Sequence, residues 1–386
     1  MQPRIYLDWN ATAPLREEAR TATLAGLDAA GNPSSIHAEG RAARRLVEQA
    51  RTEVAALVGA EPRNVVFTSG GTEANALALA PAQRQDGQAQ RLLVSAIEHP
   101  SVLAGGRFPA AAVERLAVTH AGQLDLDALE ERLEAVGGRV LVSLMLANNE
   151  TGVVQPVSQA ASLVHQAGGI LHVDAVQAAG RLPCDMKALG ADLLTISGHK
   201  IGAPKGVGAL IRRDAAPPGP EPLIRGGGQE RGVRAGTENV AGIAGFGAAA
   251  AAAGRKLRAD AARTAGLRDR LEAGLRAACA EAVIFGSGAE RLPNTTLFAV
   301  AGIKAETAVI AFDLEGIAVS SGAACSSGKV QPSHVLAAMG VPPHLARAAI
   351  RVSLGPTSAE SEVDRFLETW IRLWRTLFKE RRGIAA

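Results

Sequence analysis

Short apolar runs alternate with longer helical patterns along most of this chain, and this alternation limits the possible folds more than any other feature. Five runs rich in aliphatic and β-branched residues occupy positions 64–69, 91–96, 140–147, 170–175 and 192–197. Amphipathic helical patterns separate or precede them, for example at 38–59 and 126–137. Strands that alternate with helices are typical of a mostly parallel sheet covered by helices. We therefore expect an α/β fold.

The pattern changes after residue 245. An Ala-rich helical stretch at 246–279 predicts one long helix that connects two domains. Beyond it, the apolar runs 292–302, 308–319 and 350–355 alternate with helical patterns, which is typical of a smaller α+β unit. The chain of 386 residues has the length of roughly two or three domains.

Charge and cysteine content exclude several classes of function. The formal net charge is +3, and basic and acidic residues are interleaved, without the basic block typical of nucleic-acid binding. No apolar stretch suits a membrane span, and the first ten residues lack the pattern of a signal peptide, so we expect a cytoplasmic protein. The three cysteines lie far apart and form no C-x-x-C pair, so we expect neither a disulfide framework nor a metal site.

Polar residues follow the predicted strands, and ligands of such sheets gather at the carboxyl ends of strands. Gly71 and Thr72 follow the first strand and begin a helical pattern. Free N–H groups and the helix dipole suit a phosphate there, although a plain glycine turn with Thr72 as N-cap explains the same residues. His99 follows the second strand, where a structural role is also open, and Asn149 follows the third.

The residues at the ends of the fourth and fifth strands indicate a more specific chemistry. Asp174 ends the fourth strand, where a carboxylate can cap a helix or anchor a cationic ring nitrogen. Lys200 follows the fifth strand, in a chain with only seven lysines against 34 arginines. A sheltered lysine can lose its proton and form a Schiff base with a carbonyl. A phosphate site, an acid and such a lysine are together the parts of a pyridoxal 5'-phosphate site, and His99 is placed to stack on its ring.

One cysteine lies in an unusual neighbourhood. Cys325 stands in a run of serine, glycine and alanine at 320–328, whereas buried cysteines usually have apolar neighbours. Cys279 lies on a helical pattern and Cys184 follows a Leu-Pro step, so we expect both to be packed, unreactive thiols. The different surroundings of Cys325 favour a chemical role.

The chain resembles the cysteine desulfurases, pyridoxal-phosphate enzymes of the class-V aminotransferase superfamily, over nearly its whole length. The segments that carry the resemblance are YLDWNATAP (6–14), GNPSSIH (31–37), TSGGTEAN (68–75), EHP (98–100), NNETGVVQP (148–156), HVDAVQA (172–178), SGHKIGAPKG (197–206), GGGQERGVRAGTEN (226–239), SSGAACSSG (320–328) and IRVSLG (350–355). The combination of EHP, NNETG and RAGTEN is most similar to the branch associated with nitrogen fixation. The branch of general iron–sulfur assembly is the next most similar.

The resemblance implies fold type I of the pyridoxal-phosphate enzymes. This fold has a large domain with a mostly parallel, seven-stranded sheet and a smaller α+β domain. We expect the large domain at 14–255. We expect the small domain to be formed by 1–13 and 256–386, and to carry the cysteine loop at about 320–335.

The resemblance also implies roles for individual residues. Lys200 would form the Schiff base and move the Cα proton, while Asp174 would pair with the pyridine nitrogen. Gln177 would hydrogen-bond the ring hydroxyl, and His99 would stack on the ring and assist proton transfer. Asn149 would lie beside the cofactor.

The remaining implied roles concern the phosphate, the substrate and a second subunit. The residues that would hold the phosphate are Gly71, Thr72, Ser197 and His199. Thr237 would reach the phosphate bound by the partner subunit, which makes a homodimer part of the active site. Arg351 would bind the substrate carboxylate through two parallel hydrogen bonds, and Asn32 would approach the substrate.

By the same resemblance, Cys325 would attack the sulfur of L-cysteine, leave L-alanine and carry the sulfur as a persulfide. An acceptor such as an iron–sulfur scaffold protein, in the service of nitrogenase or of general assembly, would receive it. A selenocysteine lyase and a small-amino-acid aminotransferase of the same superfamily are alternatives. A non-catalytic binding protein is an alternative of another class.

Overall fold

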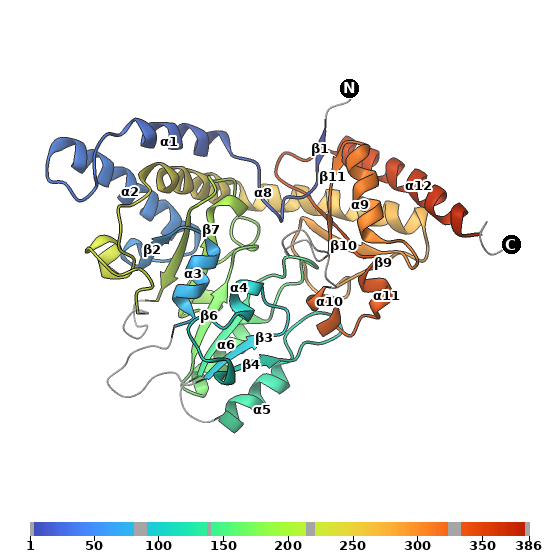
Figure 1. The fold of residues 1–386 in the computed structure, drawn as a ribbon, viewed down its shortest axis with the longest axis horizontal. Helices are drawn as coiled ribbons and strands as arrows, with labels where there is room; N and C mark the ends of the chain where they lie inside the picture. The colour runs from blue at the N-terminus through green and yellow to red at the C-terminus, as the bar shows by residue number, and fades with distance from the viewer. Residues whose placement is uncertain (1–3, 81–90, 137–139, 214–220, 323–332, 383–386) are drawn as a thin grey trace.

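The structure, a computed structural model, describes residues 4–80, 91–136, 140–213, 221–322 and 333–382. Figure 1 shows two units joined by one long helix, α8 (Val240–Ala278), which runs from the larger unit to the smaller one. Strand β1 (Ile5–Tyr6), although first in the chain, lies in the smaller unit beside elements from the last third of the sequence.

The larger unit is built on a seven-stranded sheet. Its strands, in spatial order, are β2 (Val65–Thr68), β8 (Gly208–Arg212), β7 (Leu193–Ser197), β6 (Ile170–Asp174), β5 (Val140–Met145), β3 (Arg91–Ser95) and β4 (Val113–Leu116). Only β8 runs antiparallel to its two neighbours; every other pair is parallel. The α/β fold with a mostly parallel seven-stranded sheet is therefore confirmed.

Helices cover this sheet and connect its strands. They are α1 (Glu17–Asp28), α2 (Ala38–Leu57), α3 (Gly71–Ala78), α4 (Pro100–Leu103), α5 (Leu126–Val136), α6 (Val157–Gln166) and α7 (Met186–Leu189), with the 3-10 turns η1 (Pro62–Asn64), η2 (Ala110–Ala112), η3 (Gly198–Lys200) and η4 (Gln229–Gly232). Helix α2 buries Ala43, Val47, Ala50 and Val54, a helical spacing that places one apolar stripe against the core.

The smaller unit contains a four-stranded antiparallel sheet and a short parallel pair. The sheet has the order β12 (Ser320–Ser321), β13 (Ile350–Ser353), β10 (Thr295–Ala299) and β9 (Val283–Ile284), and β1 pairs with β11 (Ile317–Ala318). The helices are α9 (Ala305–Leu314), α10 (His334–Ala338), α11 (Pro343–Ala346) and α12 (Glu360–Arg382). Four aromatic rings fill its core: Phe298, Phe312, Phe366 and Trp370.

One run in this unit differs from the expectation. The segment 308–319 was expected to behave as one of the strand-like runs, and that expectation is wrong. Most of it forms α9, and only its end forms β11. Ala308 and Phe312 are buried whereas Ile310 and Leu314 are exposed, so the apolar residues occur on both faces of the helix and leave no clear periodicity.

Helix α8 contributes to both cores. Phe246, Ala249 and Ala250 pack in the core of the seven-stranded sheet, whereas Leu271 and Leu275 pack in the core of the smaller unit. The predicted connecting helix is thus confirmed, although it begins at Val240 rather than at 246. The domain boundary at 255 stays a prediction.

The cysteines and the helix lengths bear on two further expectations. Cys184 and Cys279 are buried in the two cores, as expected, and burial raises the pKa of the Cys184 thiol to about 12. Cys325 and most of the loop predicted to carry it lie outside the described residues.

Within the described ranges, no helix combines the length and apolar character that a bilayer span requires.

Candidate active site

A pocket opens at the carboxyl ends of β2, β5, β6 and β7, and it encloses about 740 Å³ including its open mouth. Most of the predicted site residues line it together: Gly71, Thr72, His99, Asn149, Asp174, Gln177, Ser197, His199, Lys200 and Arg351. All but Arg351 come from the larger unit, and Arg351 comes from β13 of the smaller unit. Gly71 and Arg351, which are 280 positions apart in sequence, therefore meet in one pocket.

Asp174 is the last residue of β6, and two donors hold its carboxylate in place. Its Oδ1 accepts the backbone N–H of Val176 at 2.9 Å, and its Oδ2 accepts Nδ2 of Asn75 at 2.8 Å. The side chain is buried, with 5 % of its residue surface exposed. The two hydrogen bonds fix the orientation of the Asp174 carboxylate at the edge of the pocket.

His99 is the N-cap of the short helix α4. Its Nδ1 accepts the backbone N–H of Ser101 at 3.1 Å and lies 2.8 Å from the hydroxyl of Ser101. Burial lowers the pKa of His99 below its ordinary value, and the charge of Lys200 lowers it further, although Asp174 acts in the opposite direction. The imidazole is therefore neutral at neutral pH, and the hydrogen bond from Ser101 N–H assigns its proton to Nε2.

The N-terminus of α3 forms one wall of the pocket. A Cβ placed on Gly71 would lie only 2.9 Å from Cγ2 of Val176 and 3.3 Å from Cβ of Ser197, so the wall fits closely because residue 71 is glycine. His199 also lines the pocket, and burial together with the nearby charges of Lys200, Lys205 and Arg181 lowers its pKa to about 4. This wall therefore offers neutral hydrogen-bonding groups and a helix N-terminus.

Lys200 lines the same pocket. Its Nζ donates to the backbone carbonyl oxygens of Asn10, at 2.5 Å, and Ala11, at 2.9 Å. Both carbonyls belong to the segment that follows β1, so the first residues of the chain fold back onto the site. The sequence resemblance included this segment, but no residue in it was predicted to be functional.

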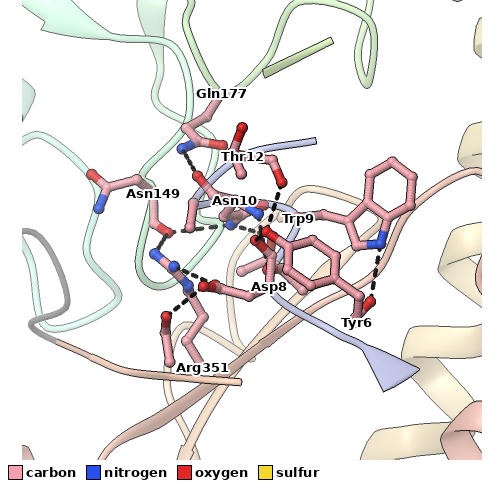
Figure 2. A network of polar contacts seen from close by, with 12 residues as sticks. Tyr6, Asp8, Trp9, Asn10, Thr12, Asn149, Gln177 and Arg351 are labelled. Carbon is pink, nitrogen blue, oxygen red and sulfur yellow. Dashed lines mark hydrogen bonds and ion pairs between the residues drawn. The ribbon is translucent and has the colours of Figure 1, made fainter. Parts of the chain in front are cut away.

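Arg351 is almost fully buried, and its contacts are drawn in Figure 2. Its Nη2 forms an ion pair with Oδ1 of Asp8 at 2.8 Å, and its Nη1 donates to the backbone oxygen of Asn149 at 2.9 Å. Its Nε is buried and has no hydrogen-bond partner among the residues that the structure describes. Arg351 thus lines the pocket with a donor still to be satisfied.

Two predicted residues, Asn32 and Thr237, do not line this pocket, and a third lies outside the described residues. Asn32 is exposed, and its Oδ1 accepts the backbone N–H of Ser34 at 2.9 Å. Thr237 is exposed on the segment that precedes α8. Cys325 lies outside the described residues, so its position relative to the pocket stays a prediction.

Sequence reasoning missed several residues that shape the site. Asn10 donates its Nδ2 to Asn149 O and to Thr295 Oγ1, while its backbone oxygen accepts from Gln177 and Lys200. Glu98 is fully buried behind the pocket; burial and the charge of Asp174 hold its pKa well above the ordinary value. Only the polarity of segments 6–14 and 98–100 could have suggested these roles.

A family model described as Aminotransferase class-V matches residues 5–366 of the chain. The cysteine desulfurase of Cereibacter sphaeroides is 46% identical over 372 residues, which cover 95% of this chain and 94% of the relative. Cysteine desulfurase IscS of Dictyoglomus turgidum is 38% identical and covers 97% of this chain and 95% of its own length.

Solved structures agree with these relatives. The NifS-like protein of Rickettsia africae superposes with a TM-score of 0.87 at 37% identity and covers 96% of this chain and 99% of its own. A structure described as SspA in complex with cysteine gives a TM-score of 0.75 at 28% identity, with coverage of 92% and 100%. The chain therefore belongs to the class-V aminotransferase family and, within it, to the cysteine desulfurases.

Proposed function

We propose that this protein uses pyridoxal 5'-phosphate to convert L-cysteine into L-alanine, and that it passes the sulfur on through Cys325. The observation that carries the proposal is the single pocket in which Lys200, Asp174 and Arg351 meet. These residues supply an amine for a carbonyl, an anion for a ring nitrogen and a guanidinium for a carboxylate. All three residues are needed to define this chemistry, because no two of them alone would be enough.

The pocket fits the cofactor. The phosphate would lie against the N-terminus of α3, with hydrogen bonds from Thr72, Ser197 and His199. Asp174 would pair with the pyridine nitrogen and Gln177 with the ring oxygen. When bound, pyridoxal phosphate withdraws electrons from the substrate Cα.

The side chains of the pocket would then bind the substrate and move its protons. Arg351 would bind the carboxylate of cysteine through its unsatisfied Nε and an Nη group, while Asp8 holds the guanidinium in place. Lys200, once its amine is neutral, would take the Cα proton. The neutral imidazole of His99 would donate from Nε2, because its Nδ1 is occupied by Ser101.

Cys325 would complete the reaction. Its thiolate would attack the substrate sulfur, so that an S–S bond forms while the Cβ–S bond breaks and its electron pair stays on the substrate. Protonation of that carbon gives alanine, and the sulfur remains on Cys325 as a persulfide. The thiolate is the reactive form, and a neighbouring base must generate it at neutral pH.

Three further proposals concern the setting of the enzyme. The protein would act as a cytoplasmic homodimer in which Thr237 of each subunit reaches the phosphate of the other. The final acceptor would be a protein of iron–sulfur cluster assembly, with nitrogenase as a destination, because the EHP, NNETG and RAGTEN segments resemble the nitrogen-fixation branch. The domain boundary at 255 belongs to the same proposal.

The cofactor and the reaction can be tested together. Protein mixed with pyridoxal phosphate should gain a visible absorption band and form alanine from L-cysteine. Lys200→Ala should lose the band and reduce alanine formation by about 10³-fold, since it removes both the Schiff base and the proton carrier. Lys205→Ala, five positions along the same segment and exposed, is the matched control.

The alternatives make different predictions in the same experiment. A small-amino-acid aminotransferase would yield a keto acid and would require an amino-group acceptor. A selenocysteine lyase would form alanine from selenocysteine and not from cysteine. A binding protein would show no turnover, and the normal band with none of these products would contradict the proposed desulfurase.

A further inference from the structure

Arg181 is a partly buried cation that the mechanism above does not use. Its Nη1 donates to the backbone oxygen of Gln177 at 2.9 Å and also to Oε1 of Gln177. Its Nη2 donates to the backbone oxygens of Trp9, at 3.2 Å, and Lys200, at 3.4 Å. All these acceptors are neutral, and in the described part of the chain no carboxylate lies within ion-pair distance of Arg181.

Arg181 nevertheless remains charged. Burial, together with the charge of Arg351, lowers its pKa to about 10, which is still well above neutral pH. A cation held without a carboxylate is costly unless hydrogen bonds or a ligand compensate it. Hydrogen bonds compensate the charge of Arg181, and among the described residues the only pocket-lining side chain to which it is hydrogen-bonded is that of Gln177.

The two contacts of the Gln177 amide fix its orientation. A guanidinium can only donate, so the atom beside Arg181 must be the amide oxygen; a carbonyl can only accept, so the atom beside Asn10 O, at 3.0 Å, must be the nitrogen. Figure 2 shows the amide nitrogen directed at Asn10. An amide nitrogen carries two hydrogens, and Asn10 uses one of them. The other is available to a ligand in the pocket.

We propose that Arg181 is a positioning residue that makes Gln177 a hydrogen-bond donor toward the ring oxygen of the cofactor. An amide that can only donate favours an acceptor, so the ring oxygen would be bound in its ionised form. The positive charge of Arg181 behind the amide would act in the same direction. This inference rests on the proposed use of pyridoxal phosphate.

The experiment compares Arg181→Met with Arg263→Met. Arg263 is the matched control because, among the described residues, its guanidinium donates to the neutral backbone oxygens of Gly355, Pro356 and Ser358 and not to Gln177. Each protein is loaded with pyridoxal phosphate. The measured quantities are the dissociation constant of the cofactor, the pH midpoint of its visible band and the melting temperature of the cofactor-free protein.

We expect Arg181→Met to weaken cofactor binding about 10-fold and to raise the pH midpoint of the band, because the ionised ring oxygen loses its oriented donor and a nearby positive charge. Arg181→Lys should restore part of the shift, and Arg263→Met should leave the midpoint at the wild-type value. In a Gln177→Ala background, Arg181→Met should add little, since the two residues act as one unit.

Three results would overturn parts of the account separately. An unchanged midpoint in Arg181→Met, with a normal band in wild type, would refute the positioning role alone. Equal effects of Arg181→Met with and without Gln177 would show that Arg181 does not act through the amide. A wild-type protein that gains no visible band would refute the proposed cofactor instead.

Discussion

Burial decides which groups of the pocket carry charge at neutral pH. It lowers the pKa of His99 and His199, so both imidazoles are neutral, and it raises the pKa of Glu98 well above its ordinary value, which favours the protonated carboxyl. Two hydrogen-bond donors hold the carboxylate of Asp174. The site therefore combines one carboxylate, Asp174, with two basic side chains, Lys200 and Arg351, in the same pocket.

The pKa of His99 predicts the acid limit of the reaction. Because this pKa lies below the ordinary value of 6.5, His99 stays neutral as the pH falls to about 6.5 and gains a proton only at lower pH. The rate of alanine formation at saturating cysteine should therefore decline only below that pH. His99→Gln should be slower by about 10²-fold and should lack this decline. An identical acid limb in His99→Gln would contradict the assignment, and the exposed His37→Gln is its control.

Single residues differed in how far the sequence could predict them. Lys200 and Asp174 were predictable because each directly follows a recognisable strand whose end must lie at the ligand edge of the sheet. Asn10 was not, because its contacts with Gln177 and Lys200 depend on the return of the chain start across the pocket. Local pattern carries no information about such a contact between distant segments.

At the scale of elements, a buried ion pair fastens η4 to α2 and β2. Both oxygens of Glu230 accept from Arg51 at 2.8 Å, and Oε2 also accepts the backbone N–H of Phe67 at 2.9 Å. Glu230 has a φ of 45°, a left-handed conformation that is strained for a residue other than glycine. The pair therefore keeps in place the segment that leads to Thr237.

Removal of one partner of the Arg51–Glu230 ion pair should lower the free energy of unfolding. Arg51→Met leaves Glu230 buried without its cation, and the free energy of unfolding should fall by about 3–5 kcal/mol. Urea unfolding, followed by circular dichroism, measures this free energy of unfolding. Arg270→Met breaks a pair with Asp364 that is exposed on the surface, so it should leave the free energy of unfolding nearly unchanged. Equal losses in the two variants would contradict the role given to burial.

The elements themselves were predictable where their pattern was long or purely apolar. The five predicted strands and the helices at α2, α5 and α8 are present. Strand β4 was missed because VERL contains two charged residues, and β8 because GALIR follows the glycine-rich turn after Lys200 without a clear boundary. Segment 308–319 was misjudged because an apolar run of that length is compatible with a strand or with a helix.

At the scale of the whole molecule, the pocket depends on how the two units meet. The larger unit supplies Lys200 and Asp174, the smaller unit supplies Arg351, and Asp8 comes from the segment beside β1. Helix α8 packs into both hydrophobic cores. It therefore joins the two units through the chain itself and through side-chain contacts. The sequence predicted two units and their connecting helix, but the convergence of Arg351 on the pocket came only from the family resemblance.

A shared active site predicts complementation between subunits. Lys200→Ala and Thr237→Asp should each be nearly inactive alone, since every site of either homodimer has one defect. Co-expression forms mixed dimers in which one site carries both defects and the other carries none. Random pairing in a symmetric dimer should then restore about a quarter of the wild-type activity. A mixture that stays inactive, or a fully active Thr237→Asp, would contradict the shared site.

The most direct test of the central claim follows alanine and persulfide in wild type and in Cys325→Ala, with and without a reductant. Wild type should form alanine from L-cysteine, at a higher rate when the reductant removes the persulfide between turnovers. Cys325→Ala should bind the cofactor normally, form no persulfide and lose nearly all alanine formation. Equal alanine formation by the two proteins would contradict the account, because the sulfur would then leave without Cys325.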